Sequence, residues 1–129
     1  MSKQTQVSDL MISKVETFTA DKTVLEAVKL MNEKNIGALI IVDLAGHTVG
    51  IFTERDLFKK VVVKELPLTT PLGDVMTKDL VCAQLHDDFE TIPQMMVQGG
   101  FRHVPVVDGF FPVGILSIRD VLHYYVNKK

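Results

Sequence analysis

Gly50-Ile51-Phe52-Thr53-Glu54-Arg55-Asp56 decides the fold, because the chain repeats it in similar form as Gly114-Ile115-Leu116-Ser117-Ile118-Arg119-Asp120. Each copy follows a valine and runs into an apolar, helix-like segment. A hydroxyl residue with an acid three positions later is typical of a helix N-terminus, where both side chains bind orphan backbone amides. Each stretch therefore predicts a strand-to-helix junction, and the second copy predicts an internal duplication.

The rest of the chain supports two related halves. A shift of 65 residues places Val7–Met11 on Leu72–Met76, and a shift of 64 relates the later part of each half. The predicted repeats are residues 7–62 and 72–126, joined by a linker at 63–71 that contains two prolines.

Hydrophobic spacing and turn residues predict the same element order in both halves: strand, helix, strand, hairpin, strand, helix. The expected segments are strands at 15–19, 38–42, 49–53, 80–83, 104–107 and 113–116, and helices at 23–34, 54–62, 88–98 and 118–126. Asp21 is the expected cap of the first of these helices, and Pro93 predicts a late start or a bend in the third. A half of about 55 residues is marginal alone. The expected class is therefore α/β (α+β), with two small mixed sheets that pack together with helices.

Composition limits the function. The chain has 129 residues, 47% hydrophobic and 23% charged, and its net charge of -2 disfavours nucleic acid as a partner. Its single Cys82 excludes an internal disulfide and is compatible with a reducing cytoplasm. No apolar run approaches the ~20 residues that span a bilayer. The opening residues lack the apolar region of a secretory signal. We expect a cytoplasmic protein.

No catalytic set stands out in the sequence. The four histidines are scattered without metal-ligand spacing, and Cys82 has no evident base partner. Phosphate-loop, dinucleotide-binding and nucleophile-elbow motifs are absent. The sequence thus predicts neither an enzyme nor a metal or cofactor site.

The repeated stretch does carry groups that suit a nucleotide. One carboxylate, from Asp56 or Asp120, is able to accept hydrogen bonds from both hydroxyls of a ribose. The hydroxyls of Thr53 and Ser117 are able to donate to phosphate oxygens beside a helix N-terminus. The alternative is that these residues form capping pairs and nothing more.

Basic residues close to these junctions are candidates for phosphate. Arg102 and His103 directly precede a buried strand, and a guanidinium fork matches a phosphate well. Their alternative role is a solvated strand edge. Arg55 and Arg119 precede the two aspartates and face either phosphate or a dimer surface.

An adenine ring needs an apolar slot with nearby backbone amides. The candidate positions at the starts of expected strands are Val15, Thr17, Leu80 and Cys82, and those at the start of the second strand are Gly37 and Ala38. Each of these positions also fits an ordinary core.

Taken together, these motifs resemble a known family. The paired Gly-x-x-[Ser/Thr]-x-x-Asp stretches, Ile36–Asp43, Arg102–Asp108, and the Asp-x-Met pairs at Asp9 and Asp74 look like CBS domains, named after cystathionine β-synthase. Two such repeats form a Bateman module, a pseudo-twofold pair. The resemblance covers nearly all of residues 7–126.

The resemblance implies a regulatory binding module. CBS pairs typically hold adenosine-containing ligands (AMP, ADP, ATP, sometimes S-adenosylmethionine or NAD) between the two repeats, and they often form homodimers. Binding then regulates an enzyme, channel or transporter, which for this chain would be a separate partner. The first half has Gly37-Ala38 where the second has Arg102-His103, so equal use of two sites is not expected. The rival hypothesis is a structural, dimerising module that binds no ligand.

Overall fold

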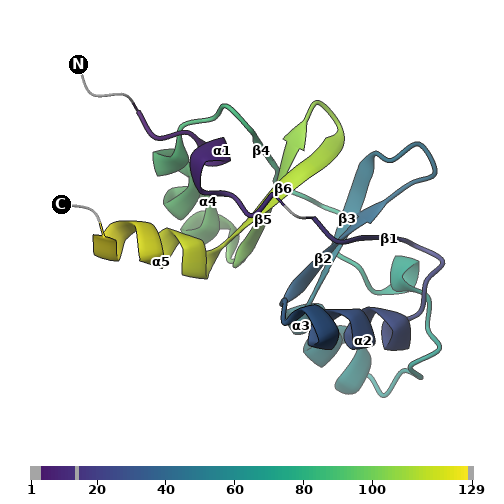
Figure 1. The fold of residues 1–129 in the computed structure, drawn as a ribbon. Coiled ribbons are helices and arrows are strands. Elements are labelled where there is room, and N and C mark those ends of the chain that lie inside the picture. The colour runs from purple at the N-terminus through teal and green to yellow at the C-terminus, as the bar shows by residue number, and fades with distance from the viewer. Residues whose placement is uncertain (1–3, 14, 128–129) are drawn as a thin grey trace. The chain divides into compact units, whose positions relative to one another are not determined.

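Each half of the chain builds one three-stranded mixed sheet (Figure 1). In the computed structural model, which describes residues 4–13 and 15–127, the first sheet contains β1 (Thr17–Thr19), β2 (Ala38–Val42) and β3 (Thr48–Thr53). The second contains β4 (Ala83–Gln84), β5 (His103–Asp108) and β6 (Phe111–Ser117). In both sheets the strands lie in chain order, the first pair parallel and the second antiparallel. The expected fold class, two small mixed sheets with helices, is confirmed.

Within the described residues, five α-helical segments accompany the sheets: α1 (Val7–Leu10), α2 (Val24–Lys34), α3 (Glu54–Asp56), α4 (Ile92–Gly99) and α5 (Ile118–Asn127). The helix after β3 is α-helical for only one turn and continues as a π-helix over Leu57–Val62. Short 3₁₀ turns cover Leu72–Asp74 and Phe89–Thr91.

These elements settle two local expectations, the cap of α2 and the effect of Pro93. The cap of α2 is Thr23 and not Asp21, because Thr23 Oγ1 accepts a hydrogen bond from the Glu26 amide at 3.2 Å. Asp21 instead accepts from the Thr19 hydroxyl. The late start that Pro93 predicts is confirmed, since α4 begins at Ile92 after a 3₁₀ turn.

The strand expected at 80–83 is wrong over most of its length. Only Ala83 of that stretch is paired, in register with Val106 of β5. Residues 80 and 81 lie where the chain passes from one compact unit to the other.

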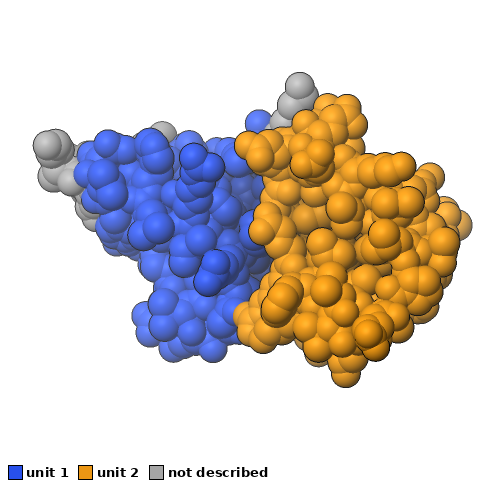
Figure 2. Space-filling view, turned by 90° about the horizontal axis from the view of Figure 1, so that it is seen from below, with its two compact units in different colours: residues 1–15, 81–129 blue, residues 16–80 orange. Residues whose placement is uncertain are grey.

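Two compact units divide the chain in an unexpected way (Figure 2). The first unit, drawn in orange and keyed as unit 2 in Figure 2, contains residues 16–80; the second, drawn in blue and keyed as unit 1, combines residues 81–129 with the residues up to 15. The leading segment of each predicted repeat therefore belongs to the unit that contains the other repeat's sheet. The predicted repeats, residues 7–62 and 72–126, group residues by sequence similarity. The two compact units group residues by their contacts in the folded chain, so the boundaries differ.

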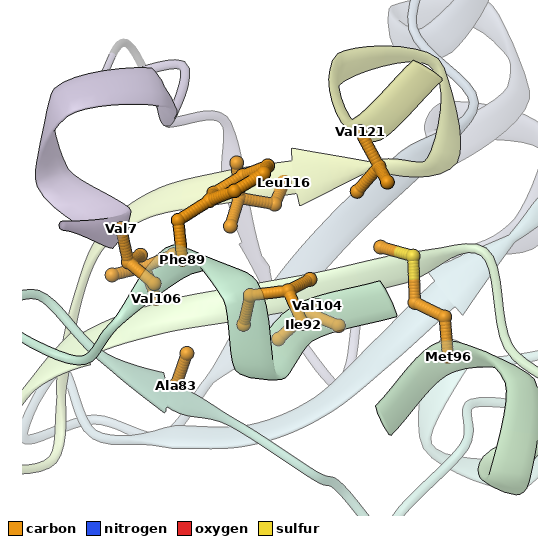
Figure 3. Close-up of a cluster of buried hydrophobic side chains, with 9 residues drawn as sticks. All are labelled: Val7, Ala83, Phe89, Ile92, Met96, Val104, Val106, Leu116 and Val121. Atoms are coloured by element: carbon orange, nitrogen blue, oxygen red, sulfur yellow. The ribbon is translucent and has the colours of Figure 1, made fainter. Parts of the chain in front are cut away.

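Buried side chains show why the leading segments lie where they do. Val7 of α1 is fully buried in the second unit among Phe89, Leu116 and Val106 (Figure 3). Figure 3 shows helix α1 bringing Val7 to the edge of this cluster, which α4, α5 and the strands complete. Burying one such side chain stabilises a fold by about 1.5–3 kcal/mol, so the leading segment is part of this core.

The first unit repeats the arrangement with the other leading segment. Leu72 is fully buried and Val75 is 2% exposed, and both pack with Phe52, Leu39 and Ile41 of the first sheet. Backbone bonds fix the segment as well, because Thr77 and Ile51 exchange hydrogen bonds of 3.0 and 2.8 Å.

The glycine of each repeated stretch is explained by these segments. A Cβ at Gly50 would lie 2.7 Å from Met76 Sδ, and a Cβ at Gly114 would collide with Met11 and approach the Ile12 carbonyl to 3.2 Å. The Asp-x-Met pairs and the Gly-x-x-[Ser/Thr] stretches are thus two halves of one contact. Each methionine covers the glycine of the other repeat's stretch.

Candidate functional site

The junction between β6 and α5 is a capping box, as the residue types predict. Asp120 Oδ2 accepts hydrogen bonds from the Ser117 amide at 2.7 Å and the Ser117 hydroxyl at 3.0 Å. Ser117 Oγ in turn accepts from the Asp120 amide at 3.2 Å. Capping therefore occupies one carboxylate oxygen of Asp120 and leaves the other, Oδ1, without a donor among the described residues.

The junction between β3 and α3 has the same box and two further donors. Asp56 Oδ2 accepts from the Thr53 amide at 3.0 Å and the Thr53 hydroxyl at 3.2 Å. Asp56 Oδ1 accepts from the Thr77 hydroxyl at 2.9 Å and pairs with Lys60 Nζ at 3.0 Å. Asp56 is only 5% exposed, so its carboxylate is buried.

Strand pairing decides which junction the basic residues join. His103 lies opposite Ser117 in the antiparallel pair of β5 and β6, and the Arg102 carbonyl accepts from the Ile118 amide at 2.8 Å. Arg102 and His103 therefore adjoin the Ser117 and Asp120 junction, a placement that the sequence left open.

Equivalent positions at the first junction carry no basic side chain. Ala38 lies opposite Thr53, and the Gly37 carbonyl accepts from the Glu54 amide at 3.1 Å. The side chains of Arg55 and Arg119 are exposed beside their aspartates, and Arg102 is exposed as well. Among the described residues, neither Arg102 nor Arg119 forms an ion pair.

A groove opens beside Asp120. It has a volume of about 360 Å³ and is lined by Asp120, His123, Tyr124 and Asn127 of α5 and by Leu10 of α1. The Asn127 amide donates to the His123 carbonyl at 2.9 Å and contacts His123 Nδ1 at 3.0 Å. The groove thus combines an aromatic wall with several polar groups.

The remaining candidates are scattered. Thr17 is the exposed first residue of β1, and Ala38 is buried in β2. Val15 and Leu80 are the last residues before the two crossings between units. Cys82 is half-buried, and this burial raises the pKa of its thiol, which keeps it protonated at neutral pH. That protonation state suits the small apolar role expected of Cys82.

The sequence motifs did not include two residues of the first junction, Lys60 and Thr77. Lys60 follows Asp56 by four positions, a spacing at which helical side chains meet, so this partner had a detectable signal. Thr77 lies 21 residues from Asp56 and had no such sequence signal, because only the path of the folded chain brings it to the Asp56 carboxylate.

Within residues 4–13 and 15–127, no cluster of three or more His, Cys, Asp or Glu side chains is arranged to hold a metal ion. No helix in the same ranges is both long enough and apolar enough to cross a membrane.

The fold and its junctions define a protein of two α+β repeats, each with a capped strand-to-helix turn that carries an aspartate. A family model for the CBS domain matches residues 7–63 and 72–127, so the chain belongs to the CBS domain family. The resemblance seen in the sequence is confirmed.

Relatives in several organisms match this chain in sequence. The chain is 34% identical to an uncharacterized 17.7 kDa protein of Acidianus ambivalens over 91% of this chain and 71% of that protein. It is 32% identical to the CBS domain-containing protein YhcV of Bacillus subtilis over 89% of this chain and 81% of YhcV. An inosine-5'-monophosphate dehydrogenase of Methanocaldococcus jannaschii matches at 35% identity, over 91% of this chain but only 23% of that enzyme.

Solved structures of CBS domain proteins have the same fold as this chain. The CBS domain pair of protein MJ0100, in complex with 5'-methylthioadenosine and S-adenosyl-L-methionine, superposes with a TM-score of 0.91 at 27% identity, covering 98% of this chain and 100% of that one. A putative signal-transduction protein with CBS domains from Burkholderia ambifaria gives 0.88 at 31% identity, covering 97% of each chain.

Proposed function

We propose that the protein is a regulatory module that binds an adenosine-containing nucleotide and signals its occupancy to a separate partner. One observation carries the proposal: the second junction places Asp120, with an unused carboxylate oxygen, beside the Arg102 and His103 strand start and at the edge of a groove. A nucleotide site requires a carboxylate that accepts hydrogen bonds from the ribose hydroxyls and cationic groups that bind the phosphate. The adenosine ligands bound by the MJ0100 pair support the same ligand class.

The experiment is thermal unfolding with AMP, ADP, ATP, S-adenosylmethionine, 5'-methylthioadenosine and NAD. A ligand at 100 times its dissociation constant stabilises the native state by about 2.7 kcal/mol, which shifts the melting temperature of a domain this size by several degrees. We expect a shift with at least one of these ligands, and a much smaller one for Asp120→Asn. If no ligand shifts the transition, the proposal fails and the structural-module hypothesis replaces it.

We also propose that the chain acts as a homodimer. Large apolar side chains lie exposed at matching places after each aspartate: Phe58 is 61% and Val62 57% exposed in the first unit, and Leu122 is 60% and Val126 78% in the second. Exposed apolar clusters of this kind mark interaction surfaces. Light scattering after size exclusion should give twice the chain mass, and Leu122→Asp should lower it. A monomeric wild-type chain would contradict the dimer and leave nucleotide binding untouched.

A further inference from the structure

The two aspartates of the repeated stretch differ in how many acceptor positions they have left. A carboxylate offers about four lone-pair positions, two on each oxygen. Asp56 has a donor for all four: the Thr53 amide and hydroxyl on Oδ2, and the Thr77 hydroxyl and Lys60 ammonium on Oδ1. Asp120 has donors for two, both on Oδ2 and both from Ser117.

The cause is a pair of sequence differences at equivalent positions. Ile51 pairs with Thr77 in the first unit as Ile115 pairs with Ile12 in the second, so Ile12 stands in the place of Thr77. Isoleucine has no hydroxyl to donate. The shift of 64 residues that relates Asp56 to Asp120 also places Tyr124 at the position of Lys60.

Tyr124 uses its ring differently from the lysine that it replaces. The ring packs on Phe89 with a centroid distance of 4.7 Å and joins the core of the second unit. It also forms a wall of the groove beside Asp120. The substitution therefore removes a cation from the carboxylate and adds an aromatic surface next to it.

We propose that the two copies have separate tasks: Asp56 is a structural residue, and Asp120 is the ribose-binding residue of the only nucleotide site among the described residues. This inference rests on the proposed function and assigns its site. The vicinal hydroxyls of a ribose need two acceptor positions, which Asp120 Oδ1 provides. To bind a ribose, Asp56 would first have to lose Thr77 and Lys60 while 5% exposed. Breaking such a buried set leaves polar groups unpaired and is strongly unfavourable.

Equilibrium dialysis of the full chain with radiolabelled AMP, ATP and S-adenosylmethionine tests the assignment. We expect one equivalent per chain for whichever probe binds. Asp120→Asn should weaken binding at least tenfold, because an amide nitrogen donates where the ribose requires an acceptor. Asp56→Asn should change the affinity less than threefold, with circular dichroism used to show that the variant is folded.

An exchange variant tests the two residues that close the first junction, with circular dichroism used to show that it is folded, because it removes both donors of Asp56 Oδ1. Thr77→Ile with Lys60→Tyr gives the first junction the isoleucine and the tyrosine of the second, and we expect it to gain a second equivalent, weaker because Gly37 and Ala38 supply no basic side chain. A variant still limited to one equivalent would show that Thr77 and Lys60 do not close the first junction.

Other outcomes separate this inference from the proposed function. Two equal equivalents in the wild-type chain, or loss of binding in Asp56→Asn but not in Asp120→Asn, would overturn the assignment and leave nucleotide binding intact. No binding of any probe would overturn both.

Discussion

Truncating Asp56 should destabilise the protein far more than truncating Asp120, although the two residues occupy equivalent positions. Asp56→Ala removes a capping box, worth about 1 kcal/mol, and leaves the half-buried Thr77 hydroxyl without the carboxylate that accepts its hydrogen bond. Losing a hydrogen bond to a charged group costs about 1.5–3 kcal/mol. Lys60 is 43% exposed, so water replaces much of its ion pair and its part is at most about 1 kcal/mol.

These contributions predict a loss of about 2.5–5 kcal/mol for Asp56→Ala. Asp120→Ala loses only its capping box, and the expected loss is about 1 kcal/mol. For a domain of this size the difference of about 1.5–4 kcal/mol corresponds to roughly 6–16 °C in melting temperature. Urea unfolding without nucleotide, followed by far-ultraviolet circular dichroism at pH 7, measures both losses.

A double-mutant cycle adds a control for the long-range contact. Thr77→Val removes the same hydrogen bond from the other side, so its cost and that of Asp56→Ala should not add. Equal losses from Asp56→Ala and Asp120→Ala, or strict additivity in the cycle, would refute the structural role assigned to Asp56.

Three further predictions concern the capping box, the cysteine and the glycine contact. The Thr23 amide, with its hydroxyl, lowers the pKa of Glu26, so this carboxylate stabilises the fold above its unfolded pKa of about 4.3 and loses that effect as pH falls through its lower folded pKa. The stability gap between wild type and Glu26→Gln should shrink over the same window in acid titrations of urea unfolding, and a constant gap would contradict this. Burial raises the pKa of the Cys82 thiol, so iodoacetamide should alkylate the native protein more slowly than the urea-unfolded chain at pH 8, and equal rates would contradict its protection. Gly114→Ala should lose about 1–3 kcal/mol by overpacking against Met11, and Met11→Ala in the same chain should restore part of the loss; simple addition of the two costs would show that the side chains do not meet.

Local features of the fold were predictable because they depend on neighbours in sequence. A hydroxyl and an acid three residues apart meet through bonds within one helical turn, so the boxes at Thr53 and Ser117 follow from residue type alone. Alternating and apolar runs likewise predicted β2 and β3 to within a residue. Even the late start of α4 follows from the fixed backbone angle of Pro93.

The tertiary structure decided which distant segments meet. Met11 covers Gly114 and Thr77 reaches Asp56, and neither contact leaves a local pattern, because each depends on where the chain crosses between units. Residue types along the chain were enough to predict two similar halves, each with a capped aspartate. Only the folded chain made those aspartates unequal, because the donors that surround Asp56 come from a segment that similarity assigns to the other repeat and from a lysine that the second repeat lacks.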